Sequence, residues 1–197
     1  MRSTLSLITA PASEPVTASE AKAHVRVDHT TEDTLITALI TAARQGVEAS
    51  TERQLISATW ELWLDAFPES GEIWLPKPPL VSVTSVKYYD SDGVLQTLAT
   101  SYYDVDAPAG PHAPRGRVRL AYDQSWPTTR SIANAVQVRY VAGWANAAAV
   151  PQELKQALLL RLGELYARRE AGVAGTIFTE TPAYRYLVGP YFAGGFV

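Results

Sequence analysis

The sequence predicts an α+β fold: a helical bundle formed by N-terminal and C-terminal helices, a β-rich antiparallel insertion between them, and an extended C-terminal tail. Three observations predict it. Apolar residues recur at helical spacing near both ends of the chain, period-two patterns of β-branched and aromatic residues fill its middle, and the last segment combines Gly with aromatic residues. We divide the chain into four regions: the N-terminal helical region (1–58), the β-rich insertion (59–145), the C-terminal helix (146–170) and the tail (171–197).

The composition is that of a globular protein. The chain has 197 residues, of which 47% are apolar and 19% charged, so it can bury a core. The formal net charge of -3 argues against a protein that binds nucleic acid by neutralising many phosphates. Because there is no Cys, disulfides, thiolate catalysis and Cys-based zinc sites are excluded.

The N-terminal region contains signals for two helices. Thr17 and Glu20 form the pattern of a capping box, which predicts a short helix to about Val27. Acidic residues after Thr31 favour a second helix over 31–50. Its predicted buried stripe consists of Leu35, Leu39, Ala43 and Val47, widened by Ile36 and Ile40.

The middle of the chain predicts strands. Alternating residues indicate strands at 59–64, 73–75, 81–89, 94–98, 102–105, 117–122 and 135–141. Asp92-Gly93 lies between two of them and is typical of a hairpin turn, because Gly adopts positive φ without a steric penalty. Frequent prolines favour a small antiparallel sheet with irregular loops.

The strongest helix signal starts at Pro151 and runs to about 170. Leu residues form a stripe too wide for one partner, so we expect this helix to pack on two sides. The residues expected to pack within the bundle and against neighbouring subunits are Leu158, Leu159, Leu162 and Tyr166.

The tail 171–197 is nearly uncharged and rich in aromatic residues, without a period of its own. Because aromatic residues are enriched in interface cores, the tail is predicted to order against a partner. The proposed contact residues are Phe178, Tyr184, Tyr186, Tyr191, Phe192 and Phe196.

No arrangement of residues indicates catalysis, a metal or a cofactor. His24, His29 and His112 lack metal-ligand spacing, and no Ser lies in a nucleophile elbow. Asp104 and Asp106 are a carboxylate pair without an identifiable partner acid. The sequence therefore predicts a protein that is not an enzyme.

Arg115, Arg117 and Arg119 alternate, so on a strand all three would lie on one face. Such a stripe could contact DNA in a channel or an acidic partner. A solvated sheet face also explains the pattern, and the acidic overall charge favours that second interpretation.

The helical segments at both ends together resemble a known family. The carriers are Thr17–Asp28, Asp33–Glu48, Thr51–Leu62 and, near the other end, Pro151–Glu170. Their order and combination look like the head-tail connector (adaptor) proteins of long-tailed bacteriophages, which also occur in gene transfer agents. The insertion and the tail carry no motif that we can match to the family.

The resemblance implies a structural virion protein of the neck, made in the host cytoplasm and assembled as a homo-oligomeric ring, usually a dodecamer. Such a ring docks on the portal protein, extends the DNA channel without sequence-specific DNA binding, and receives a stopper or tail-terminator protein. No membrane is involved, and the short, Ser- and Thr-interrupted apolar stretch at the N-terminus does not suit a secretion signal.

Two alternatives remain open. The chain could be another neck or tail-completion protein. It could also be a small enzyme whose site is built from scattered residues such as His112, Asp104 and Asp106.

Overall fold

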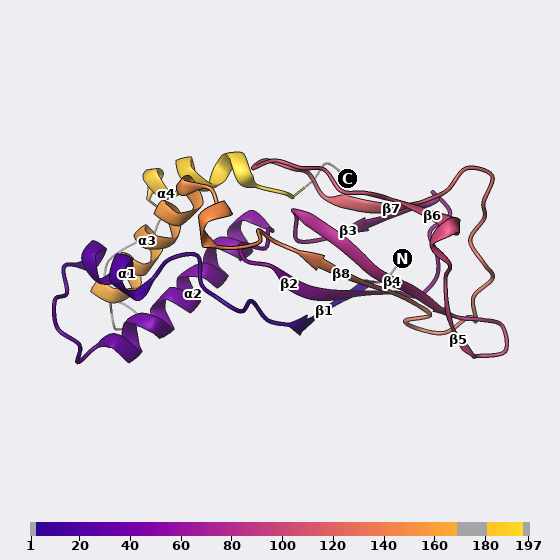
Figure 1. Cartoon of the computed structure of the whole chain (residues 1–197), viewed down its shortest axis with the longest axis horizontal. Coiled ribbons are helices and arrows are strands. Elements are labelled where there is room, and N and C mark those ends of the chain that lie inside the picture. The colour runs from indigo at the N-terminus through magenta and orange to yellow at the C-terminus, as the bar shows by residue number, and fades with distance from the viewer. Residues whose placement is uncertain (1–2, 169–180, 195–197) are drawn as a thin grey trace, which may run out of the picture.

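The structure is a computed structural model, which describes residues 3–168 and 181–194. Helices gather at one end of its long axis and strands at the other (Figure 1). The described residues form four α-helices and two antiparallel sheets, which confirms the α+β class. No helix among them is both long enough and apolar enough to span a membrane.

Most helix and strand positions agree with the sequence patterns. The helices are α1 (Ala18–Val25), α2 (Asp33–Thr51), α3 (Gln152–Ala167) and α4 (Pro182–Val188). The strands are β1 (Ser3–Thr9), β2 (Ala58–Leu64), β3 (Glu72–Leu75), β4 (Leu80–Tyr89), β5 (Leu95–Thr97), β6 (Tyr103–Asp106), β7 (Gly116–Leu120) and β8 (Val136–Ala142). Three short 3-10 turns lie at Thr100–Tyr102, Ala147–Ala149 and Gly189–Tyr191.

The strands form two sheets rather than the single small sheet that the sequence suggests. One has the order β1-β2-β8-β4-β5 and the other β3-β7-β6. Buried side chains from both sheets share one core cluster, in which Val86, Val118 and Val138 are fully buried. Gly116 allows the close approach of β7 and β4, because a Cβ there would lie 2.4 Å from Leu80 Cδ2.

A second core cluster holds the helices together. It combines buried residues of α1, α2, α3 and α4, including Ala21, Ile40, Leu158 and Tyr184. The predicted capping box at the start of α1 is present: Glu20 N donates to Thr17 Oγ1 at 3.1 Å, and Thr17 N donates to Glu20 Oε2 at 2.6 Å. The turn at Asp92-Gly93 also joins β4 to β5 as predicted, with Gly93 at φ 82°.

The buried face of α2 differs from the predicted stripe. Ile36, Ile40, Ala43 and Val47 are buried, whereas Leu35 is 37% exposed and Leu39 only partly buried. A spacing of four residues drifts by about 40° at each step around a helix of 3.6 residues per turn. The buried residues Ile36, Ile40, Ala43 and Val47 are spaced by four, three and four residues. This spacing compensates for the drift and therefore defines the contact face.

The first described residues form a strand, although the sequence patterns place residues 1–58 in a helical region. Strand β1 pairs antiparallel with β2, from Ser3 opposite Leu64 to Thr9 opposite Thr59. Ser and Thr between the apolar residues obscured its alternation. The open edge of β2, which the local sequence of β1 does not reveal, supplies the pairing.

The C-terminal segment also differs from the extended tail that the sequence predicts. Residues 182–191 form α4 and a 3-10 turn, and Tyr184, Val188 and Tyr191 belong to the helical core. Thr181 caps α4 through its side chain, which accepts from Tyr184 N, and Pro182 begins the helix. These are ordinary helix-start signals, and the abundance of Gly and aromatic residues hid them.

We predict that Leu158→Asp lowers the free energy of unfolding by about 3–5 kcal/mol, because Leu158 is fully buried and a charge there would have no partner. Urea denaturation followed by circular dichroism measures this. The matched control is Leu35→Asp on α2, where Leu35 is 37% exposed and a change within about 1 kcal/mol is expected. Equal losses in the two variants would contradict the assigned packing.

Candidate functional site

The residues named for the enzyme alternative, His112, Asp104 and Asp106, do not form a catalytic site. The ring of His112 packs on Tyr191 with centroids 4.5 Å apart, and its Nδ1 lies 3.2 Å from the carbonyl oxygen of Pro190. Asp106 Oδ2 accepts from Arg117 Nε at 3.0 Å, and Asp104 lies 3.8 Å from Arg119. Among the described residues, no group of three or more acidic or His side chains could hold a metal ion.

The arginine stripe is paired within the chain. Arg117 lies between Asp106 and Glu72, with its Nη1 2.9 Å from Glu72 Oε1, and its guanidinium stacks over Trp74 at 4.9 Å. Asp106 raises the pKa of Arg117 further above its ordinary value. Arg115 Nη2 donates to Glu52 at 2.5 Å. These carboxylates favour the interpretation as a solvated sheet face. A channel contact of Arg115, Arg117 and Arg119 stays a prediction.

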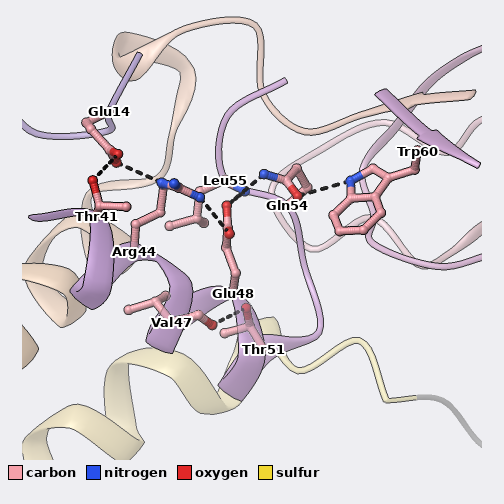
Figure 2. Close-up of polar contacts among 9 residues, drawn as sticks. All are labelled: Glu14, Thr41, Arg44, Val47, Glu48, Thr51, Gln54, Leu55 and Trp60. Atoms are coloured by element: carbon pink, nitrogen blue, oxygen red, sulfur yellow. Dashed lines mark hydrogen bonds and ion pairs between the residues drawn. The ribbon is translucent and has the colours of Figure 1, made fainter. Parts of the chain in front are cut away.

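A buried polar network lies where the helical end meets the sheets (Figure 2). At its centre is Glu48 near the end of α2, with 8% of its surface exposed. Its carboxylate accepts from three donors: Arg44 Nη1 at 2.9 Å, Gln54 Nε2 at 2.8 Å and the backbone N of Leu55 at 3.1 Å. Gln54 Oε1 in turn accepts from Trp60 Nε1 of β2 at 3.1 Å. The network therefore connects α2 to the larger sheet.

Arg44 pairs with a carboxylate on each of two sides. Its Nε donates to Glu14 Oε2 at 2.7 Å, and Thr41 Oγ1 donates to Glu14 Oε1 at 2.8 Å. Burial alone would lower the pKa of Arg44, but Glu14 and Glu48 raise it. Burial raises the pKa of Glu48, and the Arg44 charge counteracts that shift. With every charge paired, the network serves to hold elements together.

The sequence patterns did not predict this network. Arg44 and Glu48 are spaced i,i+4 on α2 and lie next to Ala43 and Val47, on the face that the pattern predicts as buried. An ion pair at helical spacing beside a buried stripe was the available signal. Its partners Glu14 and Gln54 come from outside α2, and no local pattern connects them to it.

The C-terminal segment is fixed to the helical core by polar contacts. Tyr184 Oη donates to Ser50 Oγ at 3.1 Å and Tyr191 Oη to Glu153 Oε2 at 3.1 Å. Arg53, 2% exposed, donates from Nε to the carbonyl oxygen of Tyr191 at 2.5 Å. Burial raises the pKa of Tyr191 to about 12.

The predicted partner-binding residues therefore separate into groups. Tyr184 and Tyr191 are buried within the chain itself, so they are inaccessible to a partner. Tyr186 and Phe192 are 83% and 56% exposed. Phe178 and Phe196 lie outside the described residues.

The residues predicted to contact neighbouring subunits pack inside the subunit. Leu158 and Leu162 are fully buried by the chain's own helices, and Leu159 is 9% exposed. Tyr166 is partly buried, and its hydroxyl donates to Glu32 at 2.5 Å. The width of the apolar stripe on α3 is explained by α1, α2 and α4, which all contact it.

Comparison with known proteins gives a family match over a portion of the chain. Residues 16–107, somewhat less than half of it, match the sequence model of the phage gp6-like head-tail connector protein family. This confirms the resemblance carried by α1 and α2. The matched range continues through the sheets as far as β6 and ends before α3, whereas the resemblance in the sequence includes α3 and, of the sheets, only the part of β2 up to Leu62. No curated protein matches the chain at a significant level.

Solved structures match over the whole chain. The neck of an empty gene transfer agent particle, with C6 symmetry, contains a chain that is 23% identical, with a TM-score of 0.81. The virion of a native gene transfer agent contains one that is 24% identical, with a TM-score of 0.80. The neck of the native particle, with C12 symmetry, gives 22% and 0.78. Each match covers 98% of this chain and 97% of the other, so the complete fold is shared.

We predict that Glu48→Ala lowers the free energy of unfolding by about 3–5 kcal/mol, because breaking a buried ion pair leaves its donors without an acceptor. Urea denaturation of the purified variant measures this. Glu72→Ala is the control: Glu72 pairs with Arg117 at a partly exposed position, so a loss below about 1 kcal/mol is expected. A loss that is no larger for Glu48 than for Glu72 would show that the network does not hold the two ends together.

Proposed function

We propose that this chain, with the phage gp6-like head-tail connector match over residues 16–107, is a head-tail connector of a virion neck. The observation that carries the proposal is the combination of that family match with a whole-chain fold shared with neck proteins of gene transfer agents. The matched family consists of connector proteins, so the role is structural and no reaction is assigned to the chain.

The assembly is proposed to be a ring. The related neck structures have C6 and C12 symmetry, which supports a symmetric oligomer with identical copies around one axis. In this proposal twelve copies dock on the portal protein, extend the DNA channel, and receive a stopper or tail-terminator protein on the opposite side. The helical regions (1–58 and 146–170), the insertion (59–145) and the tail (171–197) would then be the working units of each copy.

The surface proposed to contact the portal is the exposed side of α4 and the turn after it. Tyr186 is 83% exposed and borders an open cavity of about 490 Å³ that is also lined by His112, Glu153 and Pro190. Phe192 is 56% exposed beyond the turn. Aromatic residues on a segment fixed to the core from beneath present apolar area at a low entropic cost.

The charges of the chain suit a DNA channel that does not retain DNA. The net charge is -3, and Arg115, Arg117 and Arg119 lie within 4 Å of carboxylates of the same chain. Because tight DNA binding requires cations that neutralise phosphates, such a surface allows DNA to slide past. The mechanism that follows is geometric: the ring holds a channel open and presents docking surfaces.

Sedimentation velocity tests the proposal directly. The purified chain is measured alone and mixed with portal rings isolated from the same particle. Co-sedimentation at a fixed multiple of the portal ring is expected and gives the stoichiometry. If the chain binds a tail-side component and not the portal, it is a different neck or tail-completion protein. If it stays at 21.4 kDa with every component, the connector role is wrong.

We predict that combining Tyr186→Ala with Phe192→Ala leaves the melting temperature unchanged within a few degrees and weakens co-sedimentation with portal rings by at least about tenfold. Both side chains are exposed, so their loss affects the docking surface rather than the core. Deletion of the whole tail is a poorer test, because it also removes the buried Tyr184 and Tyr191.

Tyr122→Ala is the control for this pair. Tyr122 is 98% exposed in the loop after β7, so neither stability nor portal binding should change. Unweakened binding by the double variant would show that the portal contact lies elsewhere.

A further inference from the structure

We propose that strand β1 is an acceptor edge, to which another protein of the particle adds an extended segment as an outer strand. The segment would be uncharged, about five to seven residues long, with apolar side chains at alternate positions. The inference rests on the proposed function in one respect, because the symmetry of the proposed ring excludes a second copy of the chain as the occupant of this edge.

Strand β1 is the outermost strand of the five-stranded sheet. Among residues 3–168 and 181–194 it pairs only with β2, and no turn or loop hydrogen bond within this part of the chain reaches Ser3–Thr9. In an antiparallel pair every second residue directs its N–H and C=O away from the partner strand. One side of β1 therefore presents a row of backbone donors and acceptors for another strand.

The edge lacks the usual protection against strand addition. Its sequence, STLSLIT, contains no charged residue and no Pro, although Lys and Pro are the common devices that prevent edge pairing. Leu7 and Ile8 are 47% and 45% exposed. A register shift between Leu7 and Thr9 is the one irregularity, and it leaves Ser3–Leu7 in continuous register with β2.

The side chains of β1 indicate the chemistry of the segment. Leu5 lies opposite Leu62 and packs against the core between the sheets, and Leu7 lies opposite Trp60 on the same face. An added strand with apolar side chains on this face would extend that core by one strand. Its other face would meet Thr4 and Ser6, which suit small polar side chains.

The other sheet edges of the described residues do not match β1. Strand β5 has three residues, and β3 and β6 have four each. The carboxylates of Glu72 on β3 and of Asp104 and Asp106 on β6 are engaged with arginines. If β3, β5 or β6 of a second copy paired with β1, some of β1 would stay unpaired. Pairing with β3 or β6 would also place charges beside the apolar residues of β1.

A pair of β1 strands from two copies is excluded by the proposed ring. Two identical antiparallel edges are related by a twofold axis, which would turn one copy upside down relative to its neighbour. In a ring around a channel all copies point the same way. A parallel pairing of two free β1 edges would also relate the copies by about half a turn, because β2 occupies the other edge of each β1, whereas neighbours in the proposed ring of twelve are related by a twelfth of a turn. With these sheet edges of a second copy set aside, we assign the added strand to a different protein.

The test uses hydrogen–deuterium exchange of the full chain with a defined probe, an end-blocked peptide of alternating Thr and Val seven residues long. At peptide concentrations up to about 1 mM, exchange at the outward amides of β1 is expected to slow at least about tenfold. Protection should stay confined to β1. No protection of β1 under these conditions would overturn the inference.

Leu7→Lys provides the matched variant, because a charge on the edge opposes an apolar strand. It should abolish the protection without lowering the melting temperature, since Leu7 is 47% exposed. The control is Leu95→Lys on β5, at the other edge of the same sheet, where Leu95 is 45% exposed; protection of β1 should persist. Equal loss in both variants would also overturn the inference.

Self-association gives the remaining outcome. If β1 is protected without peptide, and protection rises with protein concentration as dimers form, the occupant is a second copy and the inference is wrong. Failure of the connector role is distinguishable, because it appears as absent co-sedimentation with portal rings while the peptide still protects β1.

Discussion

A carboxylate that is removed from water needs donors around it, and in this chain that requirement fixes how α2 joins the sheets. Glu48 takes donors from its own helix, from the Gln54 side chain and from the backbone of Leu55, so the chain must turn back on itself directly after α2. Gln54 then positions Trp60 at the start of β2, and the neighbouring Ile56 forms a bridge with Trp144 after β8. The two cores, one between helices and one between sheets, are connected at this junction.

The arrangement suits a component that holds neighbouring proteins in fixed positions rather than one that carries out a reaction. Polar groups at the junction are paired with one another, and the arginines of β7 are paired with carboxylates of the same sheet. Exposed apolar and aromatic side chains occur on several elements, among them Tyr186 on α4 and Leu7 and Ile8 on the edge strand β1. The two proposed docking surfaces lie on different elements, as a connector between two larger assemblies requires.

Much of the local structure could be predicted from the sequence. The capping box of α1, the turn at Asp92-Gly93 and the strand patterns depend on neighbouring residues, and these predictions are confirmed. The buried face of α2 was predicted to within one residue. Leu35 and Ile36 are both apolar, and only the packing of the folded chain shows that Ile36 is the buried one. The candidate surface was only partly predictable: Tyr186 and Phe192 are exposed, but Tyr184 and Tyr191 fill the chain's own core. Composition does not distinguish an aromatic residue that packs inward from one that faces a partner.

The sequence by itself therefore determined the class of the fold, the positions of most elements and the connector resemblance, because periodicity, caps and turns act over a few residues. Only the tertiary structure decided what distant segments do to one another. Strand β1 exists because β2 offers an edge, α4 buries Tyr184 and Val188 because α2 and α3 leave a surface for them, and Arg44 is neutralised by Glu14, thirty residues before it. These outcomes depend on burial and on pairing across long stretches of chain, and desolvation, which drives both, acts only once the segments have met.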